Sequence, residues 1–224
     1  MLLSFSNVSL EYGDGRKALD SVSFVLPPGG FYVLAGPSGA GKSSLLKLIY
    51  GAARANSGSI FLFDRDIEGL DRAELADARR RIGIVFQDGR LVPYLSVMEN
   101  TALPLRLTGA DEDYIQRHAR ELLTWVGLGD RLDAKPSELS GGEQQRAAIA
   151  RAVVAKPALM LADEPTGNID DETALRLMHL FNELNKMGTA VIIATHQQHL
   201  VERFKKPVLR LQAGRLVSPA TRAA

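Results

Sequence analysis

Short, uninterrupted hydrophobic runs alternate along this chain with longer segments whose hydrophobic positions repeat at helical spacing. The runs are bounded by glycine or polar residues, and they comprise Phe31–Ala35, Ile82–Phe86, Leu159–Ala162 and Ala190–Thr195. Such continuous runs are typical of strands that are buried on both faces, as in a parallel sheet. Strands that alternate with helices predict an α/β fold with a mainly parallel sheet flanked by helices.

Further β segments are predicted towards both ends of the chain. Three β-prone segments lie in the first part of the sequence: Leu2–Leu10, Val22–Leu26 and Ser59–Phe63. Near the other end, Val208–Leu211 and Arg215–Val217 flank a turn at Ala213-Gly214 and predict a terminal hairpin.

Helices are predicted between the strands. They cover Ser44–Ile49, Leu70–Arg81, Ala147–Val154 and Asp171–Met187. Three consecutive arginines, Arg79 to Arg81, end the second of these helices. Because cations are favoured at a helix C-terminus, we expect these arginines on a solvated face.

The region from Asp88 to Glu138 has a different character. Turn residues, including Pro93 and Pro104, alternate there with helical pieces. The clearest helix is Asp111–Val126, which has one apolar stripe formed by Ile115, Ala119, Leu122, Leu123 and Val126. We therefore expect a helical subdomain at residues 88–138, inserted into an α/β core formed by residues 1–87 and 139–224.

The most specific chemical signal is a glycine-rich segment between the run Phe31–Ala35 and the helix Ser44–Ile49. It fits the pattern G-x-x-x-x-G-K-[ST] and consists of Gly36, Pro37, Ser38, Gly39, Ala40, Gly41, Lys42 and Ser43. Backbone N–H groups of such a loop surround phosphate groups, the lysine reaches the β- and γ-phosphates, and the hydroxyl binds Mg²⁺. A glycine-rich turn that binds nothing is the alternative, but the strand–loop–helix order favours the phosphate site.

Two adjacent carboxylates follow another predicted strand. Asp163 and Glu164 come directly after Leu159–Ala162, and such a pair is unfavourable unless a cation or a proton transfer uses it. Gln87 and His196 also follow apolar runs. Because ligands bind at the carboxyl ends of parallel strands, we expect these polar residues at one site. Two solvated turn acids before Pro165 are the alternative.

Two motifs allow both a structural and a functional interpretation. Ser140, Gly141 and Gly142 precede a long helical run and form a possible second anion cradle, but Ser140 and Glu143 also fit a capping box. Tyr12 lies in a turn with neighbouring glycines. It is either a partly exposed turn residue or a platform on which a purine base stacks.

Composition narrows the function classes. The chain has 224 residues, of which 46% are hydrophobic and 24% charged, with a net charge of +1 and no cysteine. This balance gives no support to nucleic-acid binding, and the absence of cysteine fits a reducing, cytosolic setting. We find neither a signal peptide nor an apolar stretch of about 20 residues that could span a bilayer. At a membrane, another polypeptide would supply the span.

The order of these motifs resembles that of the ATP-binding-cassette (ABC) ATPase family over nearly the whole chain. The octapeptide Leu139–Arg146, LSGGEQQR, is the most specific of them, and it lies between the phosphate loop and Asp163-Glu164. The resemblance implies a P-loop NTPase (RecA-like) core with a mainly parallel sheet, an N-terminal antiparallel β subdomain and an α-helical insertion. It also implies Mg²⁺-dependent hydrolysis of ATP.

The resemblance implies a role for each matching residue. Tyr12 would stack on adenine, while Lys42, Ser44 and the loop amides would hold the phosphates. The Mg²⁺ ligands would be Ser43, Gln87 and, through water, Asp163.

Further implied roles concern the reaction and a second copy of the chain. Glu164 would polarise the attacking water, and His196 would contact the γ-phosphate and that water. The γ-phosphate bound by another copy would meet Ser140, Gly141 and Gly142, with Asp170 coupling the two sites of an ATP-sandwich homodimer. One departure from the family pattern is Gln197, where the family usually has aspartate. The sequence therefore leaves open what holds the His196 side chain in place.

Within the family, segments such as Arg80–Asp88 and Ala162–Asp171 resemble the cell-division ATPases most. An integral membrane subunit would then dock around Asp88–Leu107, and the chain would lie on the cytoplasmic face of the inner membrane. An ATPase of a lipoprotein-release or macrolide-efflux system is the alternative. A DNA-repair or translation ATPase would usually carry two cassettes or a long coiled coil, and a phosphate-loop kinase would not need the octapeptide.

Overall fold

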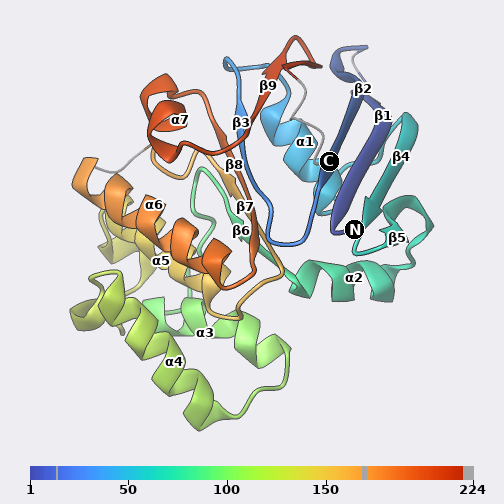
Figure 1. Cartoon of the computed structure of the whole chain (residues 1–224). Helices are drawn as coiled ribbons and strands as arrows, with labels where there is room; N and C mark the ends of the chain where they lie inside the picture. Colours follow the sequence, from blue (N-terminus) through green and yellow to red (C-terminus); the bar gives the residue numbers. More distant parts are fainter. Residues whose placement is uncertain (14, 168–170, 219–224) are drawn as a thin grey trace.

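The computed structural model describes residues 1–13, 15–167 and 171–218, and it contains two sheets flanked by helices (Figure 1). The first sheet is antiparallel and has the strand order β2-β1-β4-β5. Its strands are β1 (Leu3–Glu11), β2 (Lys17–Leu26), β4 (Ser57–Leu62) and β5 (Arg65–Asp66). This sheet is the N-terminal β subdomain that the family resemblance implies.

The second sheet has six strands in the order β10-β9-β3-β8-β7-β6. They are β3 (Phe31–Ala35), β6 (Ile82–Val85), β7 (Leu159–Asp163), β8 (Ala190–Thr195), β9 (Val208–Gln212) and β10 (Arg215–Ser218). All neighbours pair in parallel except the terminal hairpin β9–β10. The four apolar runs and the hairpin are therefore confirmed as strands, and the carboxyl ends of β3, β6, β7 and β8 meet at one edge.

Both faces of the parallel sheet are covered, which explains why its strands are continuously apolar. Leu34 of β3 packs with α1 (Lys42–Ile49) and the antiparallel sheet, whereas its neighbour Val33 packs with α5 (Gly141–Val153) and α6 (Asp171–Lys186). The remaining core helices are α2 (Arg72–Arg80) and α7 (Gln198–Phe204). Successive side chains of one strand thus enter two hydrophobic cores.

The helical insertion forms a lobe below the sheets in Figure 1. It contains α3 (Val97–Leu107), α4 (Glu112–Trp125) and the short 3-10 helices η2 (Gly129–Arg131) and η3 (Pro136–Glu138). The predicted stripe on α4 buries Ile115, Ala119 and Leu123. Because α5 contributes residues both to this lobe's core and to the core under the parallel sheet, the division between residues 138 and 139 stays a prediction.

One element of this lobe differs from the sequence-based expectation. Pro104 was expected to mark a turn, but it lies inside α3. Proline removes one backbone hydrogen bond from a helix, and the buried residues Val97, Met98, Ala102 and Leu105 hold α3 against its neighbours regardless. A capping box of Ser96 and Glu99 begins the helix and is the signal that could have revealed it.

The three arginines at the end of α2 are exposed, as expected, and two of them also contact neighbouring segments. The Arg79 side chain donates hydrogen bonds to the carbonyls of Tyr50 (2.8 Å) and Gly51 (3.0 Å), just past the end of α1. The guanidinium of Arg81 lies 3.7 Å from the centroid of the Phe63 ring. Arg80 pairs with Asp77 on the surface. Carbonyls left unpaired at a helix end attract such donors.

This arrangement predicts different effects for two neighbouring substitutions. Arg79→Ala should lower the free energy of unfolding by about 1 kcal/mol, because two carbonyls lose their donor. Arg80→Ala removes only an exposed ion pair and should change it by less than about 0.5 kcal/mol. Urea denaturation of both variants measures the difference, and equal effects would contradict the assigned role of Arg79.

Candidate nucleotide site

The segment Gly36–Ser43 connects β3 to α1 at the carboxyl edge of the parallel sheet. Gly41 precedes α1 with a φ angle of 105°, a left-handed conformation that glycine adopts readily. A Cβ atom on Gly41 would lie 2.4 Å from the Ala18 carbonyl oxygen, and one on Gly36 would lie 2.2 Å from that of Leu211. Only glycine fits at both positions, so the loop backbone can curve closely in front of the helix.

Lys42, the first residue of α1, points back into this loop. Its ammonium group donates hydrogen bonds to the carbonyls of Gly36 (2.8 Å) and Pro37 (3.2 Å), and its side chain is buried. The same Nζ lies 3.4 Å from Oε1 of Glu164. A buried cation is thus held between the glycine-rich loop and a carboxylate at the end of β7, where a terminal phosphate would need it.

Glu164 and His196 are brought together by the pairing of β7 with β8. The Glu164 Oε1 atom lies 2.9 Å from Nδ1 of His196, and Oε2 accepts a hydrogen bond from the His196 backbone at 3.3 Å. Glu164 is buried and has a φ angle of 48°. A left-handed non-glycine residue costs about 1–2 kcal/mol, and such strain is concentrated at functional sites.

Asp163 lies next to Glu164 and has an incomplete set of hydrogen bonds. Its Oδ1 atom is buried and has no partner among the described residues. Burial raises the pKa of Asp163 above its ordinary value, although a hydrogen bond with Ser43 acts in the opposite direction. A buried carboxylate oxygen with nothing to bind is suited to a cation or to a water that a cation holds.

The donor set around Asp163 fits Mg²⁺. Asp163, Ser43 and Gln87 line one pocket of about 420 Å³. Mg²⁺ in nucleotide sites takes one or two carboxylates besides phosphates and water. Groups of three or more His, Cys, Asp or Glu side chains suited to a metal are absent from the described chain.

Tyr12 follows β1 and reaches the first turn of α1. Its hydroxyl forms a hydrogen bond of 2.9 Å with Oγ of Ser44, and its ring is half-buried. The two sheets therefore place an aromatic ring beside the phosphate loop. Its stacking on adenine stays a prediction.

Ser140 forms the capping box that the structural interpretation of the octapeptide predicts. It caps α5, and its hydroxyl and backbone N–H both donate to the Glu143 carboxylate at 2.8 Å. The backbone hydrogen bond from Ser140 lowers the pKa of Glu143. Ser140 and Gly141 are exposed, and no described hydrogen bond joins them to the chain's own phosphate loop. Ser140 and Gly141 are therefore open to solvent, and their use as a second anion cradle stays a prediction.

Sequence-based reasoning assigned no role to two polar residues of α5. Gln145 is buried and donates a hydrogen bond of 3.1 Å to the carbonyl of Pro165, which follows Glu164. Arg151 donates at 2.7 Å to the carbonyls of both Gly89 and Arg90, which follow Gln87. The helix that begins at the octapeptide is therefore tied to both loops of the site. Asp170 lies outside the described residues.

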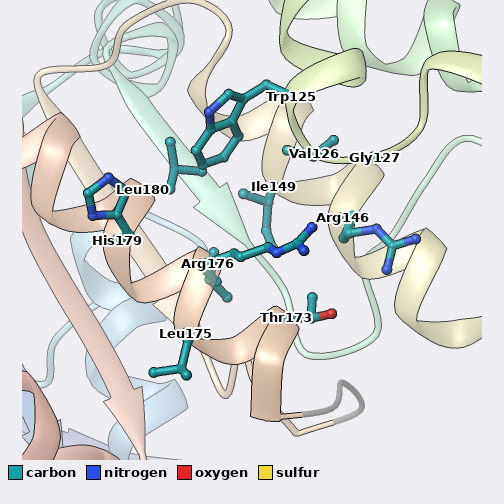
Figure 2. A pocket seen from close by; sticks show the side chains of 11 residues that line it. Trp125, Val126, Gly127, Arg146, Ile149, Thr173, Leu175, Arg176, His179 and Leu180 are labelled. Carbon is teal, nitrogen blue, oxygen red and sulfur yellow. The ribbon is translucent and has the colours of Figure 1, made fainter.

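The larger cavity of about 630 Å³ lies apart from these residues, between the end of α4, α5 and α6 (Figure 2). Trp125 from α4 and Leu180 from α6 form part of its wall, and Arg146 of the octapeptide lies on α5. None of the described lining residues belongs to the predicted nucleotide site. His179 lines this cavity, and His118 stacks on Tyr114 of α4.

The carboxyl edge of the parallel sheet holds a phosphate loop, a buried lysine and paired acidic residues. This combination defines a P-loop nucleoside triphosphatase. The family model described as "ABC transporter" matches residues 19–167. The chain belongs to this family and is accordingly an ATP-binding protein and an ATPase. The fold predicted from the resemblance is confirmed.

Named relatives and solved structures agree with this assignment. The chain is 47% identical over 216 residues to the cell division ATP-binding protein FtsE of Haemophilus influenzae, covering 96% of this chain and 99% of that protein. It is 39% identical to FtsE of Bacillus subtilis, covering 99% and 97%. The dimeric ATP-binding cassette MJ0796 bound to ADP and Pi matches with a TM-score of 0.92 and 33% identity, covering 100% of both chains. No helix in the described part of the chain is long and apolar enough to cross a membrane.

Proposed function

We propose that this chain is the ATPase subunit of an FtsE-like complex that drives conformational change in an FtsX-like membrane partner during bacterial cell division, and so regulates cell-wall hydrolysis. The observation that carries the proposal is the 47% identity to a named FtsE over almost the full length of both proteins. The chain would act on the cytoplasmic face of the inner membrane.

The proposed chemistry follows from the arrangement around Lys42. When bound, Mg²⁺ would neutralise charge on the phosphates of ATP, and Ser43, Gln87 and Asp163 would hold it. Lys42 and the loop amides bind the terminal phosphates. Glu164, already within 3.4 Å of the Lys42 ammonium and 2.9 Å of His196, orients and polarises the attacking water.

The second cradle would be used by another copy of the chain. Ser140 and Gly142 of one subunit would contact the γ-phosphate held by the loop of its twin, with Asp170 at the interface. The exposure of Ser140 and Gly141 supports this arrangement, as does the dimeric state named for the matching cassette MJ0796. ATP then joins the two subunits and its hydrolysis separates them.

A surface for the membrane partner is proposed at Asp88–Leu107. Asn100 is fully buried and fixes the preceding loop through four hydrogen bonds with Val92, Leu95 and Ser96. Tyr94 on that loop is 77% exposed, and Leu107 at the end of α3 is 62% exposed. A loop fixed by hydrogen bonds that exposes Tyr94, together with a helix end that exposes Leu107, is suited to protein contact.

The partner assignment is tested by solubilising membranes of the source cell in mild detergent and isolating the tagged full-length chain. We expect an FtsX-like membrane protein to co-purify with the wild type and with Trp125→Ala, and to be lost with Tyr94→Asp. Recovery of a lipoprotein-release or efflux permease in its place would overturn the proposal.

The shared site is tested by Ser140→Arg. This bulky cation should leave ATP affinity unchanged, since no described contact joins Ser140 to its own loop, but should lower turnover at least about 100-fold by blocking the partner's phosphate. The matched variant Ser137→Arg, at an exposed turn before the octapeptide, should retain turnover. Full activity of Ser140→Arg would contradict a site built from two subunits.

A further inference from the structure

The turn that follows Glu164 is held from two sides by side-chain amides. Glu164 has the strained φ angle of 48° and is followed by Pro165 and Thr166, both buried. A strained residue persists only where its surroundings determine its conformation. The contacts of this turn therefore control where the Glu164 carboxylate lies.

One side of the turn is held by α5. Gln145, which is 4% exposed, donates its amide hydrogen to the Pro165 carbonyl at 3.1 Å. The opposite side is held by the segment that joins β8 to α7. The Thr166 hydroxyl donates to Oε1 of Gln197 at 3.2 Å, and Thr166 itself is only 6% exposed.

Gln197 is well placed to transmit this constraint to His196, its chain neighbour. Its backbone N–H donates to the fully buried Thr195 hydroxyl at 3.1 Å, which fixes the residue relative to β8. Its side chain makes no capping hydrogen bond to α7, so the amide is not occupied by the start of that helix. The hydrogen bond to Thr166 thus closes a ring that contains Glu164 and His196, which also contact each other.

We propose that Gln197 is a positioning residue that fixes Glu164 through Thr166. This inference rests on the proposed role of Glu164 in ATP hydrolysis. Aspartate, usual at this position in the family, is one methylene shorter than glutamine and negatively charged. Glutamine reaches Thr166 and provides an uncharged acceptor for its hydroxyl.

The test compares Gln197→Ala, Thr166→Val and the double variant in the full-length chain, with Mg²⁺ present and ATP varied up to saturation. Each single variant should lower kcat about threefold to tenfold, the effect of one ordinary hydrogen bond, while KM and nucleotide affinity stay unchanged. The double variant should lose no more than either single variant, because both remove the same bond. Gln197→Glu keeps an acceptor of the same length and should retain most of the wild-type kcat.

Gln198→Ala is the matched control, since Gln198 is exposed and its side chain forms hydrogen bonds only with Glu202 and Arg210 among the described residues. Its kcat should equal that of the wild type. Additive losses in the double variant, an unchanged kcat in Gln197→Ala, or a loss that appears in KM would each overturn the inference. Glu164→Gln, measured alongside, separates the two proposals. If it keeps full turnover, the role of Glu164 fails. If it is inactive while Gln197→Ala is normal, only the role of Gln197 fails.

Discussion

Glu164→Gln should bind ATP normally and hydrolyse it at least about 100-fold more slowly than the wild type, the range expected when a general base is removed. Glutamine keeps the shape of the side chain, but its neutral amide cannot polarise the attacking water or accept a proton from it. Because hydrolysis would no longer separate the subunits, the variant should also form a more stable dimer with ATP. Phosphate release and light scattering with and without ATP measure the two effects.

The matched control for this experiment is Glu121→Gln, on the exposed face of α4, which should behave like the wild type in both assays. A Glu164→Gln protein that stays monomeric with ATP would count against the shared site. Retention of wild-type turnover would remove Glu164 from the reaction altogether.

Lys42→Ala should weaken ATP binding about tenfold to 100-fold, because a charge-assisted contact to phosphate contributes about 1.5–3 kcal/mol. In the structure the ammonium group already lies within the loop, 2.8 Å from the Gly36 carbonyl oxygen and 3.4 Å from Glu164. Loss of this cation removes the charge that faces the β- and γ-phosphates. Titration with a fluorescent ATP analogue measures the affinity.

Lys186→Ala serves as the control for Lys42→Ala, since Lys186 is an exposed lysine at the end of α6 that pairs only with Glu183 among the described residues. It should bind ATP as the wild type does. An affinity that is equally unchanged in Lys42→Ala, in a protein whose melting temperature shows that it is folded, would contradict the phosphate-loop assignment.

The predicted elements succeeded where local pattern and burial coincide. The run Phe31–Ala35 became β3 with the same limits, because a strand covered on both faces needs every side chain to be apolar. Helix α4 could equally be predicted from the sequence, because its apolar residues have helical spacing and Asp111 caps its N-terminus. Pro104 misled the prediction for α3 because a local rule about proline was outweighed by packing against α4 and α5.

The arginines of α2 show the same limitation for polar side chains. They are exposed, as their position at a helix end predicts, but nothing in the local sequence indicates that Arg79 donates to the carbonyls of Tyr50 and Gly51 just past the end of α1. Gln145 is a parallel case within the site. Gln145 belongs to the octapeptide, but its hydrogen-bond partner, the Pro165 carbonyl, lies on a loop 20 residues further along the chain.

The sequence by itself determined the class of fold, the phosphate loop, the family and the polar residues that follow each strand, because these depend on residue type and spacing along the chain. The tertiary structure alone decided that Glu164 lies between Lys42 and His196, that Ser140 is turned towards solvent, and that Gln145 and Gln197 hold the turn after Glu164. Those contacts join segments far apart in the chain, so they arise only when parallel strands bring their carboxyl ends to one edge and helices pack over both faces of the sheet.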